Sequence, residues 1–94
     1  MPTWRTPKLK KLAFAFLSLK SETDLQNFLR DLCTLDEINE LSNRFEIAQM
    51  INKKMSYREI AKKTKTSTTT VARIAYWLNN GEGGYKKALE NIKK

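Results

Sequence analysis

The 94-residue sequence contains no histidine and a single cysteine, Cys33. Histidine is the side chain most often used as a general base near neutral pH and as a ligand for transition metals, so its absence removes the usual means of both. One thiol cannot form a disulfide within the chain, and a zinc site would need mostly carboxylate ligands. These absences predict no enzyme activity, no metal and no cofactor, in a reducing, cytoplasmic compartment.

A long apolar run is also missing. Residues 8–19, KLKKLAFAFLSL, place a basic stretch before a short apolar one, as a signal peptide does. No small-residue cleavage pattern follows, because the chain continues as KSETDL, and the apolar run is far too short to span a bilayer. We therefore expect neither a signal peptide nor a membrane partner.

The formal net charge of +8 is unevenly distributed along the chain. Residues 1–20 carry five bases and no acids, residues 21–50 carry seven acids and two bases, and residues 53–73 carry seven bases with Glu59 as the one acid. Positive charge concentrated outside an acidic segment favours binding to polyanions. A solvated basic face would show the same composition, so charge alone leaves both interpretations open.

Strand-like alternation and internal repeats are absent, whereas helical signals recur. The sequence predicts an all-α fold of about six helices in a single domain, 1–94. Its parts would be a basic arm (1–8), dimerisation helices (9–54), a helix-turn-helix (55–80) and a short C-terminal helix (81–94). The expected helices cover 7–19, 22–32, 35–52, 57–63, a fifth from after Thr66 or Ser67 to about 80, and 85–93.

Two of these helix starts carry a capping box, in which a hydroxyl residue and a glutamate three positions later cap each other's backbone amides. The segments 34–37 (TLDE) and 56–59 (SYRE) match this pattern. The residues before the two caps, Cys33 and Met55, are apolar and suit the hydrophobic staple that accompanies such a box. Cys33 is therefore interpreted as a packing residue and not as a nucleophile.

The first helix is apolar on nearly every face, and such a helix must be enclosed. In so short a chain, a second subunit is the expected enclosing partner. We expect Leu12, Phe16, Phe28 and Phe45 at the subunit interface. Other residues expected to point inward are Leu9, Leu19, Leu25, Leu29, Leu32, Ile38, Leu41, Ala48, Ile51, Tyr85, Leu89 and Ile92.

The fifth helix has two contrasting faces. One face carries Val71, Ile74, Ala75 and Leu78 at helical spacing, and it should pack on Ile60 and Ala61 of the fourth helix. The other carries small or polar residues and an arginine: Thr69, Ala72, Arg73 and Tyr76, with Thr70 and Trp77 at its side.

A helix in the DNA major groove needs such a surface, because small hydroxyl side chains allow close approach and arginine can bind guanine. Two helices joined by a short turn with the second exposed form a helix-turn-helix. Lys65 occupies the place in the turn where glycine is usual, so a left-handed backbone there would cost roughly 1 kcal/mol. The alternative is that Ser67 simply caps a helix and the threonines are ordinary polar residues.

The segment TLDEINELSNRFEIAQMINKKMSYREIAKKTKTSTTTVARI resembles the core of the Trp repressor superfamily. The Ser-x-Arg-Glu opening of the fourth helix and Thr-x-x-Arg in the fifth carry much of the match. The preceding LAFAFLSLKSETDLQNFLRDLCTLDEI resembles the YerC/YecD-like branch of Trp-repressor-like proteins. Together the similarity covers about residues 9–80.

The resemblance implies an intertwined homodimer whose helix-turn-helix units project as reading heads on double-stranded DNA. It also implies a pseudo-palindromic operator with half-sites about one helical turn, ~34 Å, apart. The expected function is a sequence-specific transcriptional regulator, a repressor. Arg58 matches a family arginine that contacts guanine, and Thr68, Thr69, Thr70 and Ala72 match the groove-facing run, with Arg73 beside it. Expected phosphate contacts are Lys53, Lys54, Lys62, Lys63, Lys65, Thr66 and Ser67, helped by Arg5, Lys8, Lys10 and Lys11 of the arm.

The same resemblance addresses an effector. Thr34, Arg44 and Arg73 stand where the family holds tryptophan. Ile74 replaces a glycine that leaves room for the indole, and Trp77 replaces a serine near the ligand's amino group, so both add bulk to the pocket. We expect a vestigial pocket that these side chains fill, with Trp77 stacked on Arg73, and DNA binding that does not depend on tryptophan.

Other functions are open at this point. A helical protein–protein adaptor could retain the motif as packing only, although it would not need the charge of residues 53–73. A DNA-targeting module of a transposase or a replication initiator could share the motif, although neither normally carries an apolar dimerising first helix.

Overall fold

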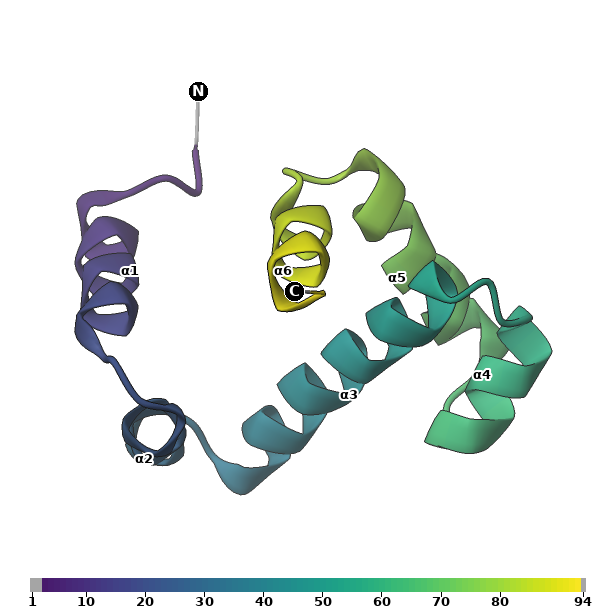
Figure 1. The fold of residues 1–94 in the computed structure, drawn as a ribbon, viewed down its shortest axis with the longest axis horizontal. Helices are drawn as coiled ribbons and strands as arrows, with labels where there is room; N and C mark the ends of the chain where they lie inside the picture. The colour runs from purple at the N-terminus through teal and green to yellow at the C-terminus, as the bar shows by residue number, and fades with distance from the viewer. Residues whose placement is uncertain (1–2, 94) are drawn as a thin grey trace. The chain divides into compact units, whose positions relative to one another are not determined.

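The computed structural model describes residues 3–93. These residues form helices without strands, which confirms the predicted all-α fold (Figure 1). The helices are α1 (Pro7–Ser18), α2 (Glu22–Leu32), α3 (Leu35–Asn52), α4 (Tyr57–Thr64), α5 (Thr68–Asn80) and α6 (Gly84–Ile92). Among the described residues, no helix combines the length and apolar character needed to cross a membrane.

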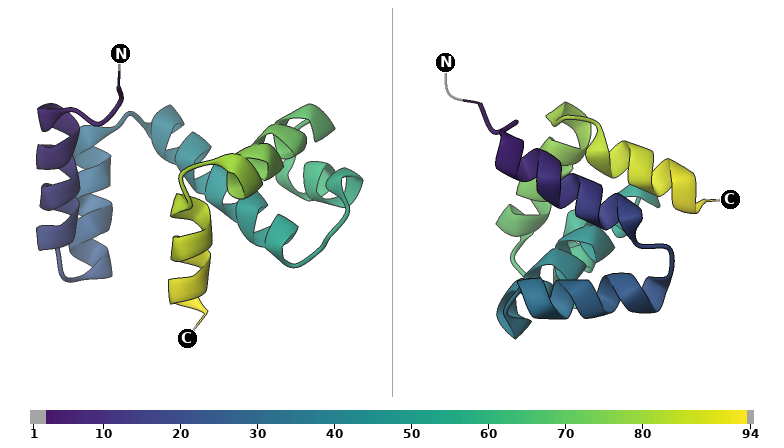
Figure 2. Two further views of the ribbon diagram at one scale, coloured as in Figure 1. Left: turned by 90° about the horizontal axis from the view of Figure 1, so that it is seen from above. Right: turned by 90° about the vertical axis from the view of Figure 1, so that its left-hand side faces the viewer.

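The chain divides into two compact units, Met1–Ile38 and Asn39–Lys94, and the division falls near the start of α3. In the first unit, α1 and α2 lie side by side as a hairpin (Figure 2). The rings of Phe16 and Phe28 meet edge to face, with centroids 5.6 Å apart. Neither helix contains a buried side chain, so this hairpin has no closed core of its own.

Side-chain caps fix the helix starts in the first unit. Thr6 accepts a hydrogen bond from the Leu9 amide at the start of α1, and Ser21 accepts one from Asp24 at the start of α2. At α3, the Glu37 amide donates to the Thr34 hydroxyl at 3.1 Å, and the Thr34 amide donates to the Glu37 carboxylate at 2.8 Å. The predicted capping box at residues 34–37 is therefore confirmed.

The second unit contains the buried core. Ile47, Ile60 and Val71, from α3, α4 and α5, have no exposed surface. They pack in one cluster with Ala48, Ala61 and Ile74, and Met55 covers it from the turn before α4. The contact of Met55 with this cluster fits the predicted staple, and Ser56 caps α4 by accepting from the Glu59 amide at 3.2 Å.

Helix α3 has two apolar faces, which the sequence reading treated as one. Ile47, absent from the expected inward residues, is fully buried, whereas Leu41, expected inward, is 49% exposed. Phe45 lies about 160° around the helix from Ile47 at 3.6 residues per turn. Ile47 packs toward α4 and α5, so Leu41 and Phe45 point to the other side of α3, where Leu41 is exposed and Phe45 is half-buried.

The turns before and after α4 contain the two non-glycine residues with positive φ among those described, Lys54 (φ 68°) and Lys65 (φ 58°). Lys65 adopts the left-handed backbone expected at its place in the helix-turn-helix. The left-handed backbone of Lys54 is not predicted by the sequence. The side chain of a non-glycine residue disfavours this backbone by about 1 kcal/mol. Both turns are nevertheless stabilised by wrapping bonds: the Met55 amide donates to the Met50 carbonyl, and the Thr66 amide donates to the Ala61 carbonyl.

Helix α5 ends at a glycine for steric reasons. A Cβ atom on Gly81 would lie 2.5 Å from the Trp77 carbonyl oxygen, so no other residue fits there without a shift of the backbone. The chain then turns into α6, where Leu89 is buried and Tyr85 packs on the core cluster. Ile92, predicted to point inward, is 56% exposed, because α6 ends there and lacks a neighbour at its last turn within the unit.

Candidate nucleic-acid interface

The leading end of α5 presents a surface of short side chains. Ser67 caps the helix by accepting a hydrogen bond from the Thr70 amide at 3.0 Å, which selects Ser67 over Thr66 as the cap. Thr68, Thr69 and Ala72 are exposed, and Arg73 follows them on the exposed side. This arrangement leaves hydroxyl and methyl groups open at the helix start, with a guanidinium one turn later.

Thr70 is placed differently from its predicted groove-facing position. Its side chain is half-buried, and its hydroxyl lies 3.1 Å from the Ser67 hydroxyl. Thr66 also turns inward, with its hydroxyl 2.9 Å from that of Thr64. Helix geometry explains the difference, because Thr70 lies on the same side of α5 as Ile74 and Trp77, one and two turns on. The exposed surface at the start of α5 therefore consists of Thr68, Thr69, Ala72 and Arg73.

The basic residues of this region are available for an external partner. All seven are exposed, and within residues 3–93 none of them has a side-chain hydrogen bond or ion pair. Arg44, by contrast, is paired with Glu40 one turn earlier on α3. The seven are Lys53, Lys54, Arg58, Lys62, Lys63, Lys65 and Arg73.

The unpaired charges have a direct electrostatic consequence. An exposed cation without an internal partner retains its full attraction for an external anion. Several such groups along one segment raise the local concentration of a polyanion and release its counterions on binding. Helix α4 contributes Arg58, Lys62 and Lys63, the turn after it contributes Lys65, and α5 contributes Arg73. The second unit thus combines a basic surface with the small-residue start of α5.

A hollow of about 450 Å³ lies beside this surface. Four of the five residues expected at an effector pocket line it: Arg44, Arg73, Ile74 and Trp77. The fifth, Thr34, is not among the lining residues and instead caps α3. The remaining lining residues, which the sequence does not predict, are Glu40, Asn43, Ile47, Thr66, Thr70 and Tyr85.

Ile74 and Trp77, the two side chains expected to fill this pocket, are placed differently from each other. Ile74 is buried in the core cluster, as predicted for a residue that takes up space there. Trp77 is 54% exposed, and its ring meets Tyr76 edge to face at 5.3 Å in place of the expected stacking on Arg73. Because Trp77 lies at the exposed edge of α5, the hollow stays open. Ile74 and Trp77 therefore line the hollow but do not fill it.

The N-terminal arm carries a separate basic group in the first unit. The Arg5 guanidinium lies 4.3 Å from the centre of the Trp4 ring, a cation–π contact. Lys8, Lys10 and Lys11 are exposed on the first turns of α1. Phe14 and Leu17 follow on the same helix with 73% and 81% of their surface exposed.

The amino-acid sequence is similar to that of a known protein family and of one bacterial protein. The sequence model described as Trp repressor protein matches residues 7–93. The uncharacterised protein YerC of Bacillus subtilis (strain 168) is 37% identical over 90 residues, which cover 96% of this chain and 86% of YerC.

Two solved structures share the arrangement of helices. The crystal structure of a TrpR-like protein from Eubacterium eligens is 39% identical, with a TM-score of 0.88 over 95% of this chain and 92% of its own. The crystal structure of a protein from Staphylococcus aureus, which is proposed to be a Trp repressor, is 32% identical, with a TM-score of 0.87 over 95% of this chain and 89% of its own.

Proposed function

The chain belongs to the Trp repressor family, and from this premise we propose that it is a sequence-specific DNA-binding repressor of transcription. In this proposal α5 enters the major groove of double-stranded DNA. Its exposed start, at Thr68 and Thr69, approaches the base edges, and Arg58 reaches the same groove from α4.

The observation that carries the proposal is the combination at α4 and α5. Within residues 3–93, the seven exposed cations of segment 53–73 lack side-chain partners, and the same segment contains a helix start whose exposed residues include threonine and alanine. Phosphates attract such cations irrespective of sequence, whereas base edges are read by short hydroxyls and by arginine. An adaptor surface would have no need of either feature. Specific reading of DNA needs both.

We propose in addition that the active species is a homodimer. The α1–α2 hairpin contains no buried side chain, and Phe14 and Leu17 are largely exposed. Helix α3 adds Leu41, which is 49% exposed. Obligate dimer interfaces are apolar in this way because they resemble a domain core divided between two chains. A twofold dimer would carry two reading heads and bind a pseudo-palindromic operator.

Tryptophan is not required in this proposal. Ile74 occupies core space beside the hollow, Arg44 is held by Glu40, and Thr34 is engaged at the cap of α3. The head is packed by Ile47, Ile60 and Val71 without any ligand. Calorimetric titration with L-tryptophan should give no micromolar binding, and addition of tryptophan should leave DNA affinity unchanged. Micromolar binding that raised DNA affinity would contradict this part.

The DNA proposal is tested by equilibrium binding to duplex DNA over a salt series. Affinity should fall by roughly 0.9 log unit per log unit of salt for each phosphate neutralised. Lys62→Ala should weaken binding to all sequences about equally and reduce that slope. Lys86→Ala on α6, outside the basic segment, is the matched control and should change neither. A flat salt dependence for the unaltered protein would contradict the proposal.

A further inference from the structure

The two lysines with positive φ, Lys54 and Lys65, lie in the turns that follow α3 and α4, and the hydrogen bonds around them follow the same pattern. Each is the left-handed residue of a wrapping turn in which the next amide reaches back five residues, from Met55 to Met50 and from Thr66 to Ala61. Glycine is the usual residue at this position, because it adopts the left-handed backbone at no steric cost. The chain has three glycines, at 81, 83 and 84, and places none of them in these turns.

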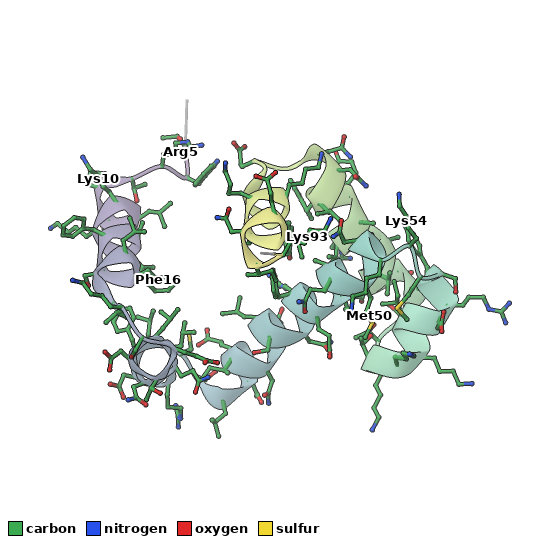
Figure 3. The ribbon with its side chains drawn as sticks, viewed as in Figure 1. Arg5, Lys10, Phe16, Met50, Lys54 and Lys93 are labelled. Atoms are coloured by element: carbon green, nitrogen blue, oxygen red, sulfur yellow. The ribbon has the colours of Figure 1, made fainter. Side chains whose placement is uncertain are left out.

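Nothing inside the described chain explains the choice of lysine. Both side chains are exposed, and neither forms a hydrogen bond or ion pair within residues 3–93. The side chain of Lys54 projects away from the ribbon (Figure 3). A cation near a helix C-terminus does gain from the helix dipole. However, Lys53 beside α3, and Lys62 and Lys63 in the last turn of α4, already supply that charge without a left-handed backbone.

The positions of the two lysines are informative. Lys54 precedes Ser56, the cap of α4, and Lys65 precedes Ser67, the cap of α5. Each therefore stands two residues before the N-cap of a helix of the proposed reading head. Residues held in a strained backbone conformation are concentrated at functional sites.

We propose that Lys54 and Lys65 contact DNA phosphates, and that at these two positions the fold gives up stability in exchange for DNA affinity. The inference rests on the proposed function and adds a specific trade-off to it. Glycine or asparagine would relieve the backbone but remove the charge. Arginine would keep the charge and the strained backbone. The two contributions can therefore be separated at one position.

The experiment uses the full chain with Lys65→Asn and Lys65→Arg, and the same pair at Lys54. Asparagine tolerates the left-handed conformation, so Lys65→Asn should raise the melting temperature by about 4 °C. The same variant should lower the slope of log affinity against log salt by roughly 0.9 for each protomer, or about 1.8 for the bound dimer, on duplex DNA of mixed sequence. Lys65→Arg should retain the affinity and slope of the unaltered protein without the gain in melting temperature. Lys86 lies within α6, so the control variant Lys86→Ala should change neither the melting temperature nor the salt slope.

The outcomes distinguish the possible failures. If Lys65→Asn and Lys54→Asn raise the melting temperature and leave affinity and salt slope unchanged, the lysines are merely tolerated and the inference is overturned. If the asparagine variants lower the melting temperature, the proposed cost in stability is overturned. If the unaltered protein binds no DNA at any salt concentration, the proposed function itself fails, before any variant is considered.

Discussion

The two units of the chain bury their apolar residues in opposite ways. Of the residues 3–93 that the structure describes, the nine buried hydrophobic ones all lie in Asn39–Lys94, on α3, α4, α5 and α6, and Ile47, Ile60 and Val71 have no exposed surface. In Met1–Ile38, α1 and α2 contain no buried residue, although Phe14 and Leu17 are among the largest apolar side chains. The helices of the second unit therefore share a buried core, whereas α1 and α2 have none.

This difference suggests that the second unit folds on its own core, whereas the hairpin depends on assembly. A unit with its own core can hold α4 and α5 at a fixed angle and present exposed polar residues outward. A hairpin without a core gains stability only from a surface that covers it, because exposed apolar area contributes nothing to folding. We therefore expect substitutions in the second unit to act on folding, and substitutions in the hairpin to act on assembly.

The largest expected effect is the loss of the core of the second unit. Ile60→Ala removes a fully buried side chain at the centre of the cluster, and such a change typically costs 2–5 kcal/mol because it leaves a cavity. Urea unfolding followed by circular dichroism measures this loss. The matched substitution Ile92→Ala, at the exposed end of α6, should cost far less. Equal losses for the two would show that the enclosed core does not determine the stability of this unit.

The next effect concerns the hairpin. Phe28→Ala removes the partner of the Phe16 ring and an expected interface side chain. A buried aromatic at the centre of an interface contributes about 2 kcal/mol or more, which corresponds to a roughly 30-fold weaker dimer. Sedimentation equilibrium at low micromolar concentration should show a dimer for the unaltered chain and a shift toward monomer for the variant. A well-folded monomer before any substitution would contradict the comparison between the units.

A comparable effect is expected in binding without a change in folding. Arg58 is exposed on α4 and has no side-chain partner within residues 3–93, so Arg58→Ala should leave the unfolding free energy nearly unchanged. If Arg58 contacts guanine, the variant should lose about 1–3 kcal/mol on the preferred DNA site and show relaxed specificity. Fluorescence anisotropy with specific and mixed-sequence duplexes separates the two. An equal loss on both would reassign Arg58 to a phosphate contact.

The smallest effect on stability is expected at Thr69. Its side chain is exposed at the start of α5, and such substitutions usually change stability by less than about 0.5 kcal/mol. Thr69→Ala should therefore fold as the unaltered chain does and bind its preferred site less selectively. Thr70→Ala, at the half-buried neighbour bonded to Ser67, is the informative comparison because it should affect folding more. If Thr69→Ala changes neither selectivity nor affinity, the threonines at the start of α5 are ordinary helix-capping residues.

Local signals made much of the fold predictable from the sequence. Side-chain caps and helical spacing depend on residues a few positions apart, so the helix starts at Thr34 and Ser56 could be read directly. The start of α5 could be read to within one residue, with Thr66 and Ser67 both open as its cap. The left-handed backbone at Lys65 was also predictable, because the helix-turn-helix pattern assigns a place to that residue. Lys54 was missed because no comparable pattern covers the turn between α3 and α4.

Features that depend on non-local packing could not be read in the same way. Two apolar faces on α3 give a mixed periodicity, so Ile47 was overlooked and Leu41 was placed inward. Thr70 lies at the border between the two faces of α5, where a helical wheel does not decide which side is covered. The edge-to-face contact of Trp77 with Tyr76 depends on side-chain rotamers, which sequence spacing does not determine.

Selection of bound duplexes from a random DNA pool by the full chain tests the central claim most directly. If the chain is a dimer that reads DNA through the start of α5, the recovered sequences should share a pseudo-palindrome whose half-sites are centred about one helical turn, ~34 Å, apart. Recovered sequences without a shared pattern, or with one unrepeated half-site, would contradict the claim.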